Sequence, residues 1–339
     1  MIDSSIDAPP PCAAANTFGA EVAIDVGGVG TGFAYAFLDA GTSLDVAVAI
    51  GTQVVILHGD NAGGFGNPTI VDTPAIGVAT GDFNDDGPTD LLLWSDNAVV
   101  VRIQDPANRG TFLAPVAFPG SFANVKNVLV ENFDGNFRPD AIVQDDNGRR
   151  VFTSNFNGSF STSTVNIGAA GDDLLFTAQV DGQARFDVVL VDQAGNVKLS
   201  LGSSGVTLSQ PVTIATGAVG HGVGVGIFTD GDNLKDLMIT TAAGGKLFKQ
   251  NTNGTFTEQP GVIPGIVGPS MSVVDINSDL TDDIVVQGSI VMQCPPTSGV
   301  FTQVESINAT APVLFEDFGT DFRPDLIRLE GTNLIVRNQ

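Results

Sequence analysis

The sequence is poor in several residue types, and each shortage narrows the range of functions. Among 339 residues, Lys and Arg number 14 against 38 Asp and Glu, which gives a formal net charge of -24. Such a charge repels nucleic-acid backbones and anionic membrane surfaces. No apolar run of about 18 residues is present to cross a bilayer, and no charged start followed by an apolar core indicates a signal peptide. We therefore expect no nucleic-acid partner and no transmembrane segment.

Residues with catalytic chemistry are also scarce. The only histidines are His58 and His221, which lie far apart in the chain. The sequence contains no nucleophile elbow, zinc-protease helix, phosphate-binding loop or paired-cysteine motif. Trp94 and Tyr35 are the only residues of their types, which argues against a lectin with an aromatic sugar site in every repeat. We predict that the protein is not an enzyme.

The chain is rich in repeats instead. Seven times, a short Asp-rich segment ends in an Asp that is followed by an apolar run, and the clearest copy is GDFNDDGPTDLLLW, Gly81 to Trp94. The closing Asp residues recur at intervals of 42 to 50 residues: Asp45, Asp90, Asp140, Asp187, Asp236, Asp283 and Asp325. A period of about 40 to 50 residues rich in short strands is the size of one propeller blade. The sequence predicts an all-β fold, a seven-bladed β-propeller of four-stranded antiparallel blades, in which residues 17–339 form one domain.

The second repeat predicts how a blade is built. Its strands are expected at Ile76 to Thr80, Leu91 to Trp94, Val99 to Ile103 and Leu113 to Phe118, with the Asp segment between the first two. The loop before the fourth strand reads Asn-x-Gly-x-Phe in this repeat, at Asn108 to Phe112, and Asn-Gly-x-Phe in two other repeats, ending at Phe160 and Phe256. Glycine supplies a turn with positive φ there. We expect the Phe to pack between blades.

The ends of the chain predict how the ring closes. The last repeat stops after its third strand, Leu334 to Val336, and Thr17 to Ile24 matches the missing fourth strand. Pairing of these segments would remove an exposed sheet edge. Cys12 and Cys294 occupy equivalent loops of the seventh and sixth blades, where a disulfide is expected and would require an oxidising compartment; two unpaired thiols are the alternative. The Pro- and Ala-rich residues 1–16 are expected to be the remnant of a tether, or else an unstructured end.

The Asp segments have the spacing of a calcium loop. A hard cation needs about six oxygen ligands, which a tight loop supplies from alternate side chains and one backbone carbonyl. The second and sixth repeats offer complete sets, and the third and seventh offer partial ones: Asp82, Asn84, Asp86, Pro88 (carbonyl) and Asp90; Asp275, Asn277, Asp279, Thr281 (carbonyl) and Asp283; Asn132, Asp134, Asn136 and Asp140; Asp317, Asp321, Arg323 (carbonyl) and Asp325. The fourth repeat has Gln179 and Gln183 where acids are needed, the first has only Asp39 and Asp45, and the fifth has a one-residue insertion around Asp230 and Asp232. These three repeats are expected to bind a cation weakly or not at all. We expect two to four structural Ca²⁺ ions; the alternative is that Asp and Asn only form side-chain-to-backbone turns.

This loop, followed by an apolar strand and later by Asn-x-Gly-x-Phe, resembles the FG-GAP/VCBS repeats of integrin α-subunit-like propellers. The resemblance covers Thr17 to Gln339, although Phe137 and Leu280 stand where the family usually has Gly. It implies that the calcium loops share one face of the ring. It also implies that partners dock on the opposite face.

Together these observations predict an extracellular, calcium-stabilised and monomeric binding or adhesion module for a protein or glycan partner. The partner is expected on the face opposite the calcium loops. Two alternatives are open: a lectin with sugar sites between blades, and a propeller related to polysaccharide lyases.

Overall fold

The computed structural model describes residues 18–66, 68–163, 167, 172–181, 186–203, 207–229, 232–286, 288–293, 298–306, 313–319 and 323–339. Cys12, Cys294 and Asp321 lie outside the described residues, as does the segment 1–16. The predicted disulfide therefore stays a prediction.

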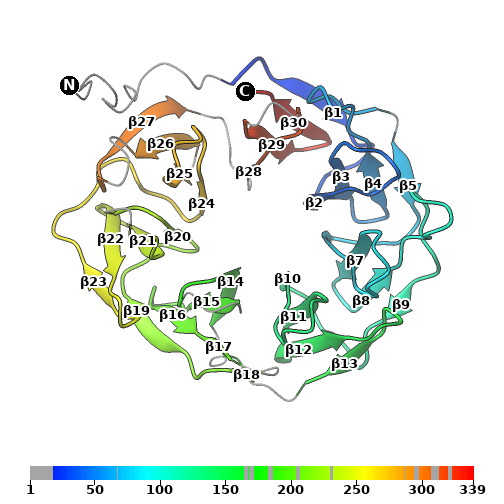
Figure 1. Cartoon of the computed structure of the whole chain (residues 1–339), viewed down its shortest axis with the longest axis horizontal. Coiled ribbons are helices and arrows are strands. Elements are labelled where there is room, and N and C mark those ends of the chain that lie inside the picture. The colour runs from blue at the N-terminus through cyan, green and yellow to red at the C-terminus, as the bar shows by residue number, and fades with distance from the viewer. Residues whose placement is uncertain are drawn as a thin grey trace, which may run out of the picture.

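Seven four-stranded antiparallel sheets are arranged as a ring around a central axis, which confirms the predicted seven-bladed β-propeller (Figure 1). The first three blades are β2(Gly32–Ala36) to β5(Thr69–Val71), β6(Gly77–Gly81) to β9(Val116–Ala117), and β10(Asn127–Glu131) to β13(Phe160–Thr162). The fourth holds β14(Asp173–Ala178), β15(Asp187–Val191), β16(Val197–Ser200) and β19(Val212–Ala215), with a separate hairpin of β17(Gly202–Ser203) and β18(Thr207–Leu208). The fifth and sixth are β20(Val223–Gly226) to β23(Phe256–Glu258) and β24(Met271–Val274) to β27(Phe301–Ser306). No helix among the described residues is long and apolar enough to span a membrane.

The seventh blade joins the two ends of the chain. It contains β28(Val313–Glu316), β29(Asp325–Glu330) and β30(Asn333–Arg337), and its outer strand is β1(Val22–Asp25). Val22 pairs with Val336 and Ile24 with Leu334. The N–H of Gly19 also donates to the Asn338 carbonyl at 2.7 Å. This register confirms the predicted ring closure, since the N-terminal strand covers the edge that β30 would otherwise expose.

The predicted strands of the second blade agree with the structure except for the outermost. The two strands between, β7(Asp90–Ser95) and β8(Ala98–Arg102), match within a residue. The fourth strand was expected over Leu113 to Phe118, but β9 holds only Val116–Ala117. That prediction was too long because the pairing with β8 is interrupted: Gln104 and Phe112 form an isolated antiparallel bridge, whose register differs by one residue from that of Val101 with Val116.

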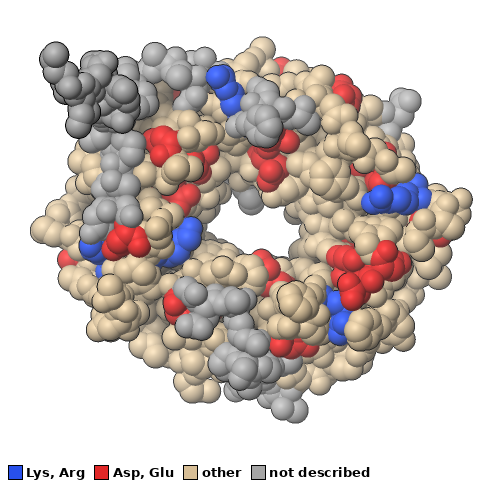
Figure 2. All heavy atoms as spheres, viewed as in Figure 1, with Lys and Arg blue, Asp and Glu red and all other residues tan. Residues whose placement is uncertain are grey.

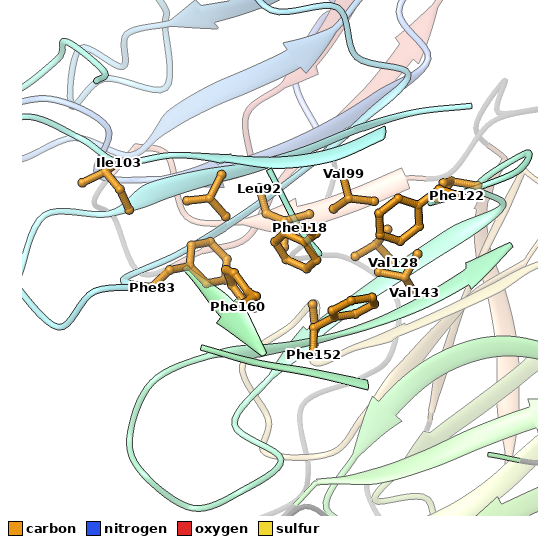
Figure 3. Close-up of a cluster of buried hydrophobic side chains, with 13 residues drawn as sticks. Phe83, Leu92, Val99, Ile103, Phe118, Phe122, Val128, Val143, Phe152 and Phe160 are labelled. Carbon is orange, nitrogen blue, oxygen red and sulfur yellow. The ribbon is translucent and has the colours of Figure 1, made fainter. Parts of the chain in front are cut away.

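Hydrophobic clusters fill the spaces between neighbouring blades. The cluster between the second and third blades contains Phe83, Phe118, Phe122, Phe152 and Phe160, all buried (Figure 3). The rings of Phe118 and Phe160 stack with centroids 3.9 Å apart. Phe160 ends the Asn-Gly-x-Phe segment of its blade, and Phe256, which ends the same segment in the fifth blade, packs against the cluster between the fourth and fifth blades. The prediction that these Phe residues pack between blades is confirmed.

Candidate functional site

The Asp that closes each repeat is a buried clamp with the same contacts in every blade. In the second blade, Asp90 Oδ2 accepts the N–H of Phe83 at 2.9 Å, seven residues earlier, and Oδ1 accepts the N–H of Gln104 at 2.8 Å, just past β8. The same two-sided bonding occurs at Asp45, Asp140, Asp187, Asp283 and Asp325. At Asp236 the Thr229 hydroxyl donates to Oδ2 and the N–H of Gln250 donates to Oδ1. Each carboxylate therefore ties the first loop of its blade to the end of the third strand.

The clamp does not require the other acids of a calcium loop. Asp187 belongs to the fourth repeat, in which Gln179 and Gln183 replace acids of the loop, yet it accepts the N–H groups of Val180 at 2.8 Å and Gly202 at 2.9 Å. The residue seven positions before the Asp is buried and apolar in six blades, and Thr229 takes this position in the fifth. The closing Asp of each repeat thus has a structural role in hydrogen bonding that does not depend on a complete calcium loop.

The second and sixth loops fold their acids inward in the same way. Asp82 accepts the N–H groups of Asp86 at 3.1 Å and Gly87 at 2.8 Å. Asp275 does the same with Asp279 at 3.0 Å and Leu280 at 2.9 Å. These contacts are the side-chain-to-backbone turns of the alternative interpretation. They use one lone pair of each oxygen, and a carboxylate oxygen has another to offer a cation.

The electrostatics of these loops favour a bound cation. Burial raises the pKa of Asp90 to about 7, and the neighbouring Asp86 and Asp82 act in the same direction. Burial likewise raises the pKa of Asp283 to about 7, again reinforced by two loop acids. A cation offsets such repulsion, and an all-oxygen donor set suits Ca²⁺. The residues present therefore fit calcium, which would neutralise the loop and cross-link its hairpin.

The backbone at position six of the loop is left-handed, a conformation that favours Gly. Gly87 has φ +100° there, and the third and sixth repeats place Phe137 (φ 71°) and Leu280 (φ 69°) in the same left-handed conformation. Such a φ is unfavourable for bulky residues. Both side chains are exposed, at 93% and 85%. The predicted departures from the family pattern are thus tolerated by the backbone.

Sequence reasoning missed a cluster in the first blade, which was expected to bind metal weakly or not at all. Among the residues that the structure describes, one set of His, Cys and carboxylate side chains brings three ligand atoms within 4.8 Å of one another: Asp39, Asp45 and His58. His58 directly precedes Gly59, whose N–H donates to the Asp45 clamp. Counting thirteen residues on from the repeat's closing Asp would have placed His58 beside its own loop.

A cavity of about 610 Å³ opens where the innermost strands begin, at the ends opposite the Asp loops. Its lining includes Gly32, Gly77, Asn127 and Val313, the first residues of β2, β6, β10 and β28, together with Trp94 and Lys126. The Asp loops follow the last residues of these strands, about 13 Å away along a five-residue strand. The cavity therefore lies toward the face where the sequence predicts a partner.

Glycine positions Trp94 in this cavity. Gly77 and Trp94 are paired residues of β6 and β7. A Cβ on Gly77 would come 2.1 Å from Cζ2 of the indole, so the ring lies directly against the glycine backbone. Gly32 in turn approaches the Gly77 Cα so closely that its own Cβ would lie 3.1 Å away. The absence of side chains at both positions leaves room for the indole.

Charge is distributed unevenly over the ring. Figure 2 shows acidic side chains gathered in separate patches over several blades, around an open centre. One basic side chain, Lys126, lines the cavity. It is about half exposed, and its Nζ lies 2.9 Å from Asp146 Oδ1.

No protein-family model and no curated protein matches the chain. Solved structures are similar over nearly its whole length. A lectin from Agrocybe aegerita that recognises non-reducing terminal N-acetylglucosamine is 16% identical with a TM-score of 0.63, covering 94% of this chain and 86% of that one. A lectin from Burkholderia pseudomallei is 16% identical, with a TM-score of 0.61 and 90% and 93% coverage. Virginiamycin B lyase from Staphylococcus aureus is 12% identical, with a TM-score of 0.60 and 95% and 100% coverage. At these identities the likeness concerns the fold alone.

Proposed function

We propose that the chain is an extracellular binding module of the FG-GAP/VCBS type, and that it holds one glycan in the cavity beside Trp94. The cavity is the observation that carries this proposal. Its volume of about 610 Å³ lies within the usual range for ligand sites, roughly 300 to 1,000 Å³. A mostly apolar lining that includes aromatic residues and a few polar groups is the usual composition of a small-ligand site, and this cavity has Phe33 and Trp94 among its apolar residues.

The chemistry of the lining suits a sugar. Trp94 offers an apolar ring, and Thr31, Lys126 and Asn127 offer polar groups around it. A pyranose has an apolar face and a polar rim, so it can stack on an indole and form hydrogen bonds at its edge. Because Trp94 is the chain's one tryptophan, this module has one site per ring instead of one per blade. A lectin with a single sugar site is compatible with a chain that has one Trp and one Tyr.

Calcium has an indirect role in this proposal. The ions would be held by the loops of the second and sixth blades, with the third and seventh as weaker candidates. Each ion would stabilise the hairpin formed by the first two strands of its blade. Metal that binds only the folded state stabilises by mass action, so Ca²⁺ would raise the melting temperature. Asp86→Ala and Asp279→Ala would each remove one bound ion, as counted by metal analysis.

A glycan array followed by calorimetry tests the function. Trp94→Ala should abolish binding of any glycan hit, and Lys126→Ala should weaken it by about 1 kcal/mol, the typical worth of one hydrogen bond. Phe137→Ala is the matched control, because it removes an exposed aromatic from an Asp loop. Equal affinity of the Trp94 and Phe137 variants for the glycan would contradict the proposed site. Binding only to protein probes would replace the glycan with a protein partner, and turnover of a polysaccharide would replace the binding module with a lyase.

A further inference from the structure

The side chains of Asp39, Asp45 and His58 converge on one point in the first blade. His58 Nδ1 lies 3.1 Å from Asp39 Oδ2 and 3.5 Å from Asp45 Oδ1. Four ligands at 2.0 to 2.1 Å from a tetrahedral zinc ion are separated from one another by about 3.3 Å. These two distances therefore match two edges of such a tetrahedron, and the Asp39 and Asp45 oxygens lie within 4.8 Å of each other.

Each ligand is held from behind by a fixed partner. Asp39 Oδ1 accepts the Gly41 N–H at 2.5 Å, which leaves Oδ2 facing His58. Asp45 is clamped by two backbone N–H groups. His58 Nε2 lies 2.8 Å from the Thr69 hydroxyl. A metal-bound histidine commonly has such a partner on its other ring nitrogen, which fixes the orientation and tautomer of the ring.

The imidazole atom that faces the carboxylates has no hydrogen bond. His58 Nδ1 is buried, and although two carboxylate oxygens lie near, neither has the geometry of an acceptor for it. Buried polar atoms are normally satisfied. An ion between the three atoms would satisfy Nδ1 and both oxygens together. Asp45 is 1% exposed but Asp39 is 31% exposed, so the ion has a path from solvent.

We propose that Asp39, Asp45 and His58 form a binding site for a first-row transition-metal dication, with Zn²⁺ as the best fit and solvent as its fourth ligand. The donor set separates this site from the all-oxygen Asp loops. Imidazole favours zinc and its neighbours over Ca²⁺ and Mg²⁺, whereas three protein ligands are too few for calcium's six to eight. The second and sixth loops contain no histidine. The two kinds of site should therefore select different ions.

The experiment uses the full chain with Ca²⁺ in millimolar excess, so that the Asp loops do not compete. Zn²⁺ is titrated by calorimetry, and Co²⁺ is used as a visible probe of four-coordinate geometry. The expected result is that one equivalent of either ion binds. Bound Co²⁺ should absorb strongly in the visible, and millimolar Ca²⁺ should not displace it. Absence of binding, or displacement by Ca²⁺, overturns the proposal.

The variants assign the site. His58→Ala and Asp39→Asn should each weaken binding at least 10-fold, and Thr69→Val should weaken it by about 10- to 100-fold, as expected for a group that orients a ligand. His221→Ala is the matched control, because His221 also lies near a carboxylate, with Nε2 3.4 Å from Asp173 Oδ2, but only one. Asp39→Asn keeps the oxygen that accepts from Gly41, so it remains informative if His58→Ala unfolds. Unchanged affinity in Asp39→Asn, or loss in His221→Ala, would refute the assignment.

Discussion

The Asp clamp predicts that a blade without a calcium loop depends on its closing Asp as much as a blade with one. Asp187 is the test case, because it is fully buried and Gln179 and Gln183 replace two acids of the calcium loop in its repeat. Asp187→Ala removes the acceptor for three N–H groups, those of Val180, Asp181 and Gly202. Each unsatisfied group costs about 1 to 3 kcal/mol. Relief of the buried charge offsets part of this, so we expect a net loss of about 2 to 4 kcal/mol.

Urea unfolding in EDTA, followed by far-ultraviolet circular dichroism, measures the loss without any contribution from calcium. Asp90→Ala in the second blade should lose a similar amount under the same conditions. Asp85→Asn is the control: this residue is exposed, has φ 62°, and is not part of a clamp. A free energy of unfolding for Asp187→Ala within about 0.5 kcal/mol of the wild type, the range of ordinary surface substitutions, would show that the clamp contributes nothing. If Asp90→Ala lowered the free energy of unfolding only when calcium is present, Asp90 would have a metal-binding role and no separate structural one.

Two further predictions concern the closure of the ring and the response to pH. Deletion of residues 1–25 should lower the melting temperature of the whole ring, because β30 loses its partner strand; an unchanged melting curve would contradict this, and a thiol count on unreduced protein tests the Cys12–Cys294 disulfide. Burial raises the pKa of Glu131 from 4.5 to about 7. Its protonated form is favoured in the folded state, so its contribution to stability is complete below pH 4.5 and is lost as the pH rises through 7. Glu131→Gln should therefore match the wild type near pH 4 and exceed it at pH 8 by up to about 3 kcal/mol; equal urea midpoints at pH 8 would refute this.

The repeat made most of the fold predictable. An Asp before an apolar strand recurs at intervals of 42 to 50 residues, which predicted the blade count and the inner strands. The match of Thr17 to Ile24 with the missing strand after Leu334 predicted the closing strand. Phe160 and Phe256 were predictable as interface residues because a loop pattern fixes their position. The length of β9 was not predictable, because the change of register between Phe112 and Val116 has no pattern in the sequence.

The candidate sites were less predictable because they depend on distances across a sheet. His58 lies thirteen residues after Asp45 and close to Asp39, because β3 pairs with β2 on one side and with β4 on the other. The calcium sets remain predictions: their spacing is readable, but turn formation and metal binding require the same residues. Trp94 gave no sign of a cavity, because the cavity is lined by residues of several blades and the indole meets Gly77 only when β6 pairs with β7.

The strand that closes the ring has a consequence for how the protein is made. β1 precedes the other described strands in the chain and its partner β30 follows them, with more than 300 residues between Gly19 and Asn338, which hydrogen bond. Contacts of such sequence separation are slow to form because the chain entropy must be lost first. Six blades can fold in order during synthesis, while β1 stays without its partner until β30 has been made. The ring is therefore completed only after β30 leaves the ribosome, and until then the chain presents an unpaired apolar strand that a chaperone or a second copy could capture.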